Sequence, residues 1–425
     1  MNLFQEIETL LRRQESAALS LPLARHLPLC LPEVPDRRCL WARPAQDDWW
    51  LGLGASWSME IGGEGHLAAS SEEAERLFHR LGLPDQARLA VWSEGRFTRL
   101  HLPAVQFIGS QGATRLVLIP DPADPEGWRP LLERALASLE SAPESIPGPP
   151  ALMRREQEPD ASAWMEAAEQ AIGEIRAGRM EKLVLARRVR YLADRDLSAS
   201  GLIRSLGYRH PQATLFAVDG EDHVWLGASP EVLLDRRGDR FFCEAVAGTV
   251  RRDPNPAVDR GLGDWLLRDP KSRREHELVV AGLREALQPF CDQAPIAERP
   301  RLLRLRGLQH LHTPIQGLLK AGVHSLEAAQ ALHPSAAVCG YPKEAAARWL
   351  ARHEPLERGG YSGLTGWIGA KGDATLNVVL RCARIQGNSA VLYAGAGLVA
   401  DSNSLAEWEE TELKLGSMIE ALQDA

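Results

Sequence analysis

The segments KLVLARRVRY (residues 182–191) and ATLFAVDGEDHVWLGASPEVLL (residues 213–234) decide the class of fold. The first reads as one β-strand, and the second predicts two further strands around a turn at residues 219–222. Strands in adjacent groups, with helices inserted irregularly, lack the alternation of strand and helix that builds a parallel sheet. The pattern therefore favours an α+β fold with antiparallel sheets over a doubly wound fold.

The rest of the chain extends this pattern in both directions. Asp160 can cap a helix of helically spaced apolar residues, and Gly178 is well placed to end it. The strand-rich N-terminal part (residues 1–150) ends in SAPESIPGPP (residues 141–150), which predicts a linker or a long surface loop. Further helices are expected at residues 272–287, 325–332 and 343–352, and strands at residues 48–61, 89–119, 241–248, 376–385 and 390–393.

The composition is that of an ordinary globular protein, because 25% of the 425 residues are charged and 44% are hydrophobic. The net charge of −8 argues against a general nucleic-acid-binding surface. Six widely spaced cysteines without a CxxC pair favour reduced thiols in the cytoplasm. Residues 1–19 lack the apolar core of a secretory signal, and the longest uncharged run, residues 385–400, is shorter than a membrane span. We therefore expect a cytoplasmic protein with no nucleic-acid or membrane partner.

The string GAGLVA (residues 395–400) has the GxGxxA spacing of a dinucleotide-binding motif. Such a site needs a helix that opens within the motif and an acidic residue about 20 positions later. Here DSNS (residues 401–404) interposes a turn, and the chain is nearly finished. We expect instead either a tight turn from strand to helix or a backbone that a ligand approaches closely.

The last predicted helix carries a stripe of charge. Ser404 and Glu407 have the spacing of a capping box, which predicts that the helix begins there. Glu407, Glu410 and Lys414 stack on one side of the helix at positions i, i+3 and i+7. Two interpretations stay open: a solvated face with one Glu–Lys pair, or a carboxylate pair one turn apart that suits a hard cation such as Mg²⁺.

A third carboxylate, Glu275, heads a stripe of apolar residues at helical spacing. A carboxylate that leads an apolar face is costly to bury unless a cation or a hydrogen-bonded partner satisfies it. The alternative is a carboxylate in the first helical turn that only complements the helix dipole. Both interpretations stay open from the pattern alone.

Two basic residues lie on predicted strand faces with short apolar neighbours. Lys182 shares its face with Val184, and Arg381 shares its face with Val379 and Ala383. Such a cation lies at a sheet edge, extends along the surface to reach water, or points at an anion in a cleft. Neither residue alone distinguishes these cases.

Taken together, many distinctive strings in one order resemble the chorismate-utilising enzymes, and most of all the isochorismate synthases. The resemblance covers residues 160–425, whereas residues 1–150 match only in being rich in strands. It rests on KLVLARR (182–188), GASPEVLL (227–234), AVAGT (245–249), REHELV (274–279), LHTPIQG (311–317), LHPSAAVCGYPK (332–343), ERGGYSGLTGW (357–367), LRCARI (380–385) and YAGAGLVADSNSLAEWEETELK (393–414).

The resemblance implies one large α+β domain, residues 1–425, in which two antiparallel sheets pack together and helices lie outside. The proline-rich stretch would then be a loop within that domain. The resemblance also implies a Mg²⁺ ion held by Glu275 and Glu410, with Glu407 acting nearby. Arg381 would grip a carboxylate of the substrate. The other residues implied to form the substrate pocket are Thr249, Tyr361, Gly395 and Lys414.

The implied reaction converts chorismate to isochorismate by adding water at C2 of the ring and expelling the C4 hydroxyl. It needs a base to activate water and an acid to protonate a poor leaving group. The resemblance assigns the base to Lys182 and the acid to Glu231. The base must be neutral and the acid must keep its proton near neutral pH, and burial favours both neutral forms. Mg²⁺ would anchor the substrate and neutralise its charge.

Other branches of the family differ at informative positions. Aminating members, which work with a glutamine amidotransferase, typically carry Gln where this chain has Lys182. Aminodeoxychorismate synthases carry a lysine before the GT pair, where this chain has Ala247. We therefore expect water as the nucleophile, no amidotransferase partner, and a monomer or weak homo-oligomer. Salicylate synthases, which eliminate pyruvate from isochorismate in the same pocket, stay open as an alternative.

A non-catalytic chorismate-binding protein is disfavoured, because such a protein would be expected to lose the base, the acid or a metal-binding glutamate. Lys182, Glu231 and Glu275 are all present.

Overall fold

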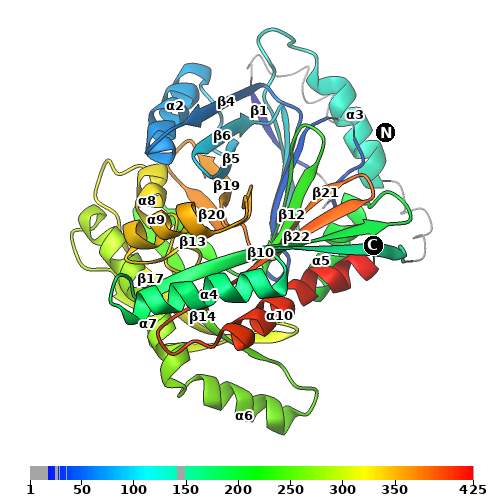
Figure 1. Cartoon of the computed structure of the whole chain (residues 1–425). Helices are drawn as coiled ribbons and strands as arrows, with labels where there is room; N and C mark the ends of the chain where they lie inside the picture. Colours follow the sequence, from blue (N-terminus) through cyan, green and yellow to red (C-terminus); the bar gives the residue numbers. More distant parts are fainter. Residues whose placement is uncertain (1–17, 24–26, 28, 35, 141–148, 425) are drawn as a thin grey trace.

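Two antiparallel β-sheets form the frame of the computed structural model, which describes residues 18–23, 27, 29–34, 36–140 and 149–424 (Figure 1). One sheet has 12 strands and the other has 10. The pairings within both sheets are antiparallel, so the expected α+β fold with antiparallel sheets is confirmed. Two predictions fall largely outside the described residues. They concern the proline-rich stretch (residues 141–150) and the absence of a secretory signal in residues 1–19.

The 12-stranded sheet, here called sheet A, contains in spatial order β1 (Leu19–Pro22), β8 (Ala113–Leu118), β7 (Val105–Ser110), β3 (Asp48–Leu53), β2 (Arg38–Arg43), β11 (Thr214–Asp219), β12 (Val224–Ser229), β21 (Cys382–Gln386), β22 (Ser389–Leu398), β10 (Lys182–Ala193) and β18 (Gly340–Tyr341), with β9 (Leu152–Glu158) also paired to β10. Sheet B contains β15 (Ile296–Ala297), β17 (Leu308–Leu318), β14 (Arg240–Arg251), β13 (Val232–Arg237), β20 (Ala374–Val378), β19 (Leu364–Gly369), β5 (Arg88–Glu94), β6 (Phe97–Leu102) and β4 (Trp57–Gly62), with β16 (Arg301–Arg304) paired to β17. The helices are α2 (His66–Leu81), α3 (Trp128–Glu140), α4 (Ala161–Arg176), α5 (Ala199–Arg209), α6 (Pro256–Leu266), α7 (Pro270–Leu287), α8 (Ser325–Leu332), α9 (Lys343–His353) and α10 (Ser404–Gln423).

The two sheets pack face to face through a core that is rich in aromatic side chains. Trp41 of sheet A meets Trp367 of sheet B edge to face, with ring centroids 6.3 Å apart. Further along the interface, Trp225 of sheet A lies 5.9 Å from Trp92 of sheet B. Aromatic rings bury large apolar areas with few rotatable bonds, so they hold the two sheets at a fixed separation.

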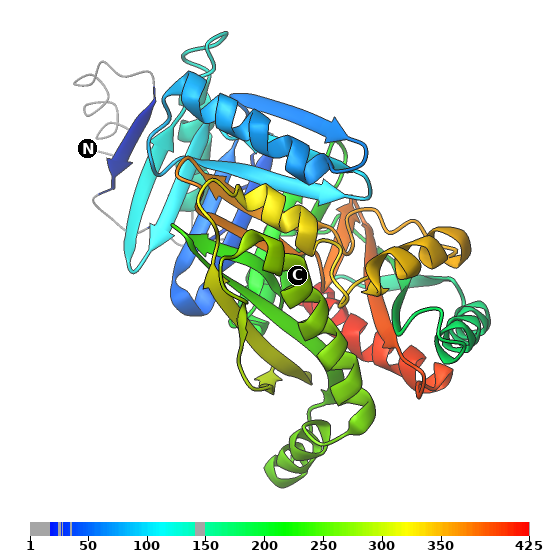
Figure 2. The same cartoon turned by 90° about the vertical axis from the view of Figure 1, so that its left-hand side faces the viewer.

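Helices cover the outer faces of both sheets, as the resemblance implied. The helices α3, α5 and α10 pack against sheet A, and α2, α7 and α8 pack against sheet B. The helices α4 and α9 cover the end of the molecule formed by β10 and β22. Figure 2 shows α2 and α8 side by side over sheet B, and both views show α6 projecting from the body.

Of the several places where the chain passes from one sheet to the other, two are neighbours in space, and we call them the crossing segments. Residues 230–231 lead from β12 in sheet A to β13 in sheet B, and residues 379–381 lead back from β20 to β21. The hydroxyl of Ser229 donates to the carbonyl of Val378 at 2.6 Å, and the amide of Ala228 donates to the carbonyl of Arg381 at 3.1 Å. The two crossing segments therefore run beside each other and support each other.

These crossings correct two of the predicted strands. Residues 213–234 form three strands rather than two, because Pro230 has no N–H for the ladder and the third strand lies in the other sheet. Residues 376–385 form two strands rather than one, because the backbone of Arg381 takes a positive φ of 47°. Arg381 therefore does not share a strand face with Val379 and Ala383.

Helices differ from the prediction in two respects. The helices α2, α3, α5 and α6 lie outside the segments predicted as helical, whereas α7, α8 and α9 begin or end within two residues of their predicted bounds. The N-cap of α10 is Asn403, whose side chain accepts from the amide of Ala406 at 3.0 Å, so the capping box at Ser404 was wrong. Asn is as good an N-cap as Ser, and its choice leaves the carboxylate of Glu407 available for other contacts.

Two further findings concern the thiols and the length of the helices. All six cysteines are free thiols, and five of them are buried. No helix in the described ranges is long and apolar enough to cross a membrane.

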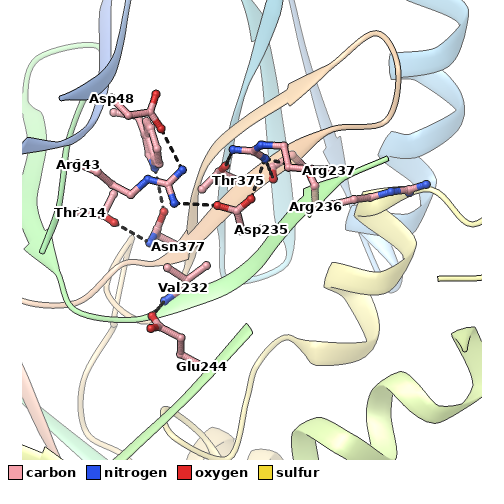
Figure 3. A network of polar contacts seen from close by, with 12 residues as sticks. Arg43, Asp48, Thr214, Val232, Asp235, Arg236, Arg237, Glu244, Thr375 and Asn377 are labelled. Atoms are coloured by element: carbon pink, nitrogen blue, oxygen red, sulfur yellow. Dashed lines mark hydrogen bonds and ion pairs between the residues drawn. The ribbon is translucent and has the colours of Figure 1, made fainter. Parts of the chain in front are cut away.

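A partly exposed network of arginines and aspartates joins the two sheets (Figure 3). Arg43 of β2 donates to Asp48 of β3 at 3.0 Å and to Asp235 of β13 at 2.8 Å. Asp235 also pairs with Arg237 at 2.8 Å, and Arg237 donates to the hydroxyl of Thr375 at 3.1 Å. We call Arg43, Asp48, Asp235 and Arg237 the arginine–aspartate network.

Candidate active site

A cavity of about 620 Å³, counted to its open mouth, lies between the sheets beside the crossing segments. Its walls come from β10, β14, β22, α7, α10 and both crossing segments. The structure thus brings together residues that are up to 230 positions apart in the chain (Val184 and Lys414). Predicted site residues that line the cavity are Glu231, Thr249, Glu275, Tyr361, Arg381, Gly395 and Lys414.

Lys182 begins β10 and lies directly behind the cavity wall. Its side chain is only 1% exposed, and its ammonium lies 3.2 Å from Oε1 of Glu275. Gly397 of the neighbouring strand lines the cavity, and a Cβ atom there would lie 2.1 Å from Glu275 Oε1 and 3.0 Å from Lys182 Cε. Only glycine therefore allows these two charged groups to approach the strand so closely.

The first of the two alternatives for the GAGLVA string, a tight turn from strand to helix, is wrong, and side chains of the protein lie close to its glycines. Close approach by a ligand stays a prediction. Gly395 and Gly397 lie inside β22, and the next helix begins only at Ser404. A Cβ atom at Gly395 would lie 2.9 Å from the hydroxyl of Tyr361. The ring of Tyr361 stacks on Tyr393, with centroids 5.6 Å apart, so both aromatic rings form one side of the cavity.

Glu231 lies on the first crossing segment, and its side chain is buried. The hydroxyl of Ser335 lies 3.5 Å from its carboxyl oxygen. Burial raises the pKa of Glu231 to about 8, although the ammonium of Lys182 acts in the opposite direction. The side chain is therefore protonated near neutral pH, and it lines the cavity as a proton donor.

Thr249 follows a bulge in β14 between Ala247 and Thr249, where Gly248 has a φ of 72°. A bulge redirects the side chains that follow it. The hydroxyl of Thr249 lies 3.2 Å from Nδ1 of His310 and also hydrogen-bonds Glu410. Thr249 therefore connects sheet B to the charged face of α10.

Arg381 lies on the second crossing segment and is held by uncharged partners. One nitrogen of its guanidinium donates to the carbonyl of Lys414 at 3.4 Å, and another donates to Nε2 of His310 at 3.1 Å. The second contact requires His310 to be neutral, and burial together with Arg381 holds the pKa of His310 well below its usual range. Within the described ranges, no carboxylate lies at ion-pair distance from this guanidinium, so its charge is available to an anionic ligand.

The three glutamates predicted to bind metal are each paired with a lysine. Both Glu275 and Glu407 are buried, so neither the solvated face nor a simple interaction with the helix dipole explains them. Burial and the nearby Glu410 raise the pKa of Glu407 to about 7. The ion pairs are Glu275 with Lys182 at 3.2 Å, Glu410 with Lys414 at 2.7 Å, and Glu407 with Lys271 in direct contact.

The carboxylates of Glu275, Glu407 and Glu410 are suitable ligands for a hard cation, but in this structure they are not already arranged to bind one. Burial alone would lower the pKa of Lys271, but Glu407, Glu275 and Glu410 together raise it, so the three carboxylates act on one common position. Carboxylate oxygens are the ligands that Mg²⁺ takes in proteins. Among the described residues, no group of three His, Cys, Asp or Glu side chains is already arranged to hold a metal ion.

Sequence reasoning missed Lys271 and His310, which both contact predicted site residues. Lys271 lies three residues before the REHELV string, and its charge one helical turn before Glu275 could have drawn attention to it. His310 and His312 alternate along β17, and such an alternation places both side chains on one face of the strand. That alternation was the available signal for His310.

Comparisons with known proteins agree with this geometry. The sequence profile described as "Chorismate binding enzyme" matches residues 29–423. The "Salicylate biosynthesis isochorismate synthase" of Pseudomonas aeruginosa is 40% identical over 269 residues, which cover 62% of this chain and 56% of that protein. "Isochorismate synthase MenF" of Bacillus subtilis is 34% identical over 272 residues, covering 64% of this chain and 58% of that protein. The match thus spans little more than half the length of these two relatives.

Among solved structures, MenF of Escherichia coli, described as the menaquinone-specific isochorismate synthase, is similar to this fold with a TM-score of 0.82. Its sequence is 27% identical, and the superposition covers 99% of this chain and 100% of that chain. The described part of residues 1–150, which matched only in being strand-rich, therefore shares the fold of that enzyme.

Proposed function

The chain belongs to the chorismate-binding enzyme family, and from this premise we propose that it isomerises chorismate to isochorismate. The observation that carries the proposal is the buried Glu231, whose pKa is raised to about 8, in one cavity with Arg381, which lies at ion-pair distance from no carboxylate of the described residues. The first group supplies an acid near neutral pH, and the second attracts an anionic substrate.

In the proposed reaction, Glu231 gives its proton to the C4 hydroxyl, which leaves as water. Lys182 takes a proton from the water molecule that forms a new bond to C2, so one water molecule is added and one is released. Lys182 must be neutral to accept that proton, and its contact with Glu275 must therefore loosen when the substrate is bound. Arg381 and Lys414 would hold a carboxylate of the substrate, and the stacked rings of Tyr361 and Tyr393 would limit access of further water.

Mg²⁺ would be held by Glu275 and Glu410, with Glu407 beside them. When bound, the ion would neutralise these carboxylates and a carboxylate of the substrate, which makes it a template and an electrostatic stabiliser. Lys271 must then yield its position among the three carboxylates, because the ammonium and the ion would share the same partners.

The activity is tested by incubating the purified protein with chorismate and Mg²⁺ and separating the products by chromatography with fluorescence detection. Isochorismate as the product is expected. Salicylate together with pyruvate would favour the salicylate synthase alternative, and no turnover would refute both. Lys182→Gln should lose activity by about 10³-fold, since a general base contributes about 10²–10⁴. The matched control is Lys371→Gln, which changes a lysine that is 70% exposed and pairs only with Asp85.

The Mg²⁺ site is tested by isothermal titration calorimetry and thermal unfolding without substrate. The ion should raise the free energy of unfolding by about 1 kcal/mol at tenfold excess over its Kd. Glu410→Gln should remove this stabilisation, whereas Glu409→Gln, at the exposed neighbouring position of α10, should retain it. Equal stabilisation of both variants would exclude Glu410 as a ligand.

A further inference from the structure

A second cavity lies on the far side of Arg381. It has a volume of about 940 Å³, counted to its open mouth. Its walls come from α10, from the loop before β17, and from residues around His210 and Ala228. None of these positions other than Arg381 was singled out as a site residue.

Each wall of the second cavity continues into the first. Along β17, Leu308 lines the second cavity and His310 lines the first. Along α10, Leu413 lines the second cavity and the next residue, Lys414, lines the first. Ala228 lines the second cavity, two residues before the crossing segment that lines the first. Arg381 lines both. The two cavities are therefore successive parts of one depression, with the guanidinium at their boundary.

The charge around the second cavity favours an anion. Its two acidic residues, Glu412 and Glu420, are already paired with arginines. Glu412 lies 2.7 Å from Arg187 and 3.0 Å from Arg155. Glu420 lies 2.6 Å from Arg209 and 3.7 Å from Arg306. Among the charged lining residues, Arg306 and Arg381 balance Glu412 and Glu420, and both glutamates are in addition paired with arginines outside the lining. Arg381 is therefore the lining charge that is left to attract an anion.

His210 adds no further charge to this wall. Burial and the nearby Arg381 lower the pKa of His210 to about 4, so the ring is neutral at physiological pH. The remaining lining is small or apolar, including Ala213, Gly416 and Ser417. An anion that moves along this surface would therefore find few groups that bind it before it reaches Arg381.

We propose that the second cavity is the entrance through which a small anionic substrate reaches the active site, with Arg381 as the group that receives it. The identity of that substrate as chorismate rests on the proposed function. The entrance itself rests on the continuous walls, on the pairing of both lining glutamates with arginines, and on Arg381, which lines both cavities.

Gly416 offers a way to block the entrance without disturbing the fold. It lines the second cavity on α10, and a Cβ atom there would have no atom within 4 Å. Gly416→Trp should therefore fill the cavity and lower kcat/KM for chorismate at least tenfold, while the Tm stays within a few degrees. The matched control is Gly173→Trp, because Gly173 is an exposed helical glycine of α4 with equally free space. An unchanged kcat/KM in Gly416→Trp would overturn the proposal.

A second measurement does not depend on turnover. Phenylglyoxal modifies arginine side chains, and peptide mass spectrometry follows the adduct at Arg381 over time. The wild type and Gly173→Trp should be labelled at Arg381 at the same rate, and Gly416→Trp at least fivefold more slowly. Equal rates in all three proteins, or no adduct at Arg381 in the wild type, would overturn the entrance. Absence of chorismate turnover in the wild type would refute the proposed function alone, because the labelling experiment still tests the entrance.

Discussion

Two polar clusters lie where the sheets of this molecule meet, one half-buried and one beside the cavity, and they differ in how their charges are balanced. In the arginine–aspartate network, Asp235 lies 2.8 Å from both Arg43 and Arg237, and its charge is fully used within the protein (Figure 3). In the cavity, Glu231 is protonated and Arg381 has no carboxylate partner within the described ranges. Burial of charge is common to both clusters, so burial alone does not indicate function. Function is indicated instead by the raised pKa of Glu231 and by the charge of Arg381, unpaired among the described residues, which both lie beside a cavity.

The largest expected effect is a loss of activity when Glu231 in the cavity is changed. Glu231→Gln should lower kcat by about 10³-fold, because loss of a general acid costs about 10²–10⁴. The free energy of unfolding at pH 7 should stay nearly the same, since glutamine has the shape of the protonated acid. Enzyme assays and urea unfolding on the same preparation measure both quantities. A kcat within tenfold of the wild type would remove Glu231 from the mechanism.

The converse substitution should affect stability and spare activity. Asp235→Asn leaves Arg43 and Arg237 without their shared carboxylate, and the loss of such half-buried charged hydrogen bonds costs about 1.5 kcal/mol. Urea unfolding should show this loss, while kcat/KM for chorismate stays within threefold of the wild type. If activity fell as far as in Glu231→Gln, the distinction between the two clusters would fail.

The pH dependence of stability should also differ between them. The pKa of Glu231 in the folded protein is about 8, above its ordinary value, so the folded state binds more protons than the unfolded state between these two pH values. The free energy of unfolding of the wild type should therefore fall as the pH rises from 6 to 9, by about 2 kcal/mol relative to Glu231→Gln. Parallel urea titrations at several pH values measure the difference. Superimposable curves would show that Glu231 titrates normally.

The smallest expected effect concerns a third arginine, which positions α10. Arg187 lies on the face of β10 opposite Lys182, donates to the hydroxyl of Thr411 at 2.6 Å and stacks 3.8 Å from the ring of Trp408. Arg187→Met should raise KM about tenfold with a smaller change in kcat, because α10 carries Lys414, and Arg187→Lys should restore part of the loss.

The control for this prediction is the neighbouring Arg188→Met. Arg188 lies on the other face of the strand, is partly exposed and pairs with Glu158 at 2.6 Å. Its removal should leave KM unchanged. Equal effects of the two variants would show that charge on β10, rather than the position of α10, matters for binding.

The class of fold and most of its strands could be predicted because alternation along the chain reports directly on antiparallel strands. The crossing segments could not be predicted so well. Residues 376–385 read as one strand, since alternation continues through the positive φ of Arg381, which depends on contacts with β12. The residues of the candidate site were predicted through the resemblance, whereas two of the lysines that pair with its glutamates, Lys182 and Lys271, were not predicted as their partners. The contact of Lys271 with Glu407 joins two helices that lie far apart in sequence.

The crossing segments also limit how this protein can change over generations. Most loops of the fold connect strands of one sheet or lead to a helix, and a gain or loss of a residue there shifts only the surface. At residues 230–231 and 379–381, an insertion or deletion would turn Glu231 or Arg381 away from the cavity. Because hydrogen bonds join the two segments, a shift in one would also displace the other. These two short stretches should therefore keep a constant length among descendants, even where their residues vary.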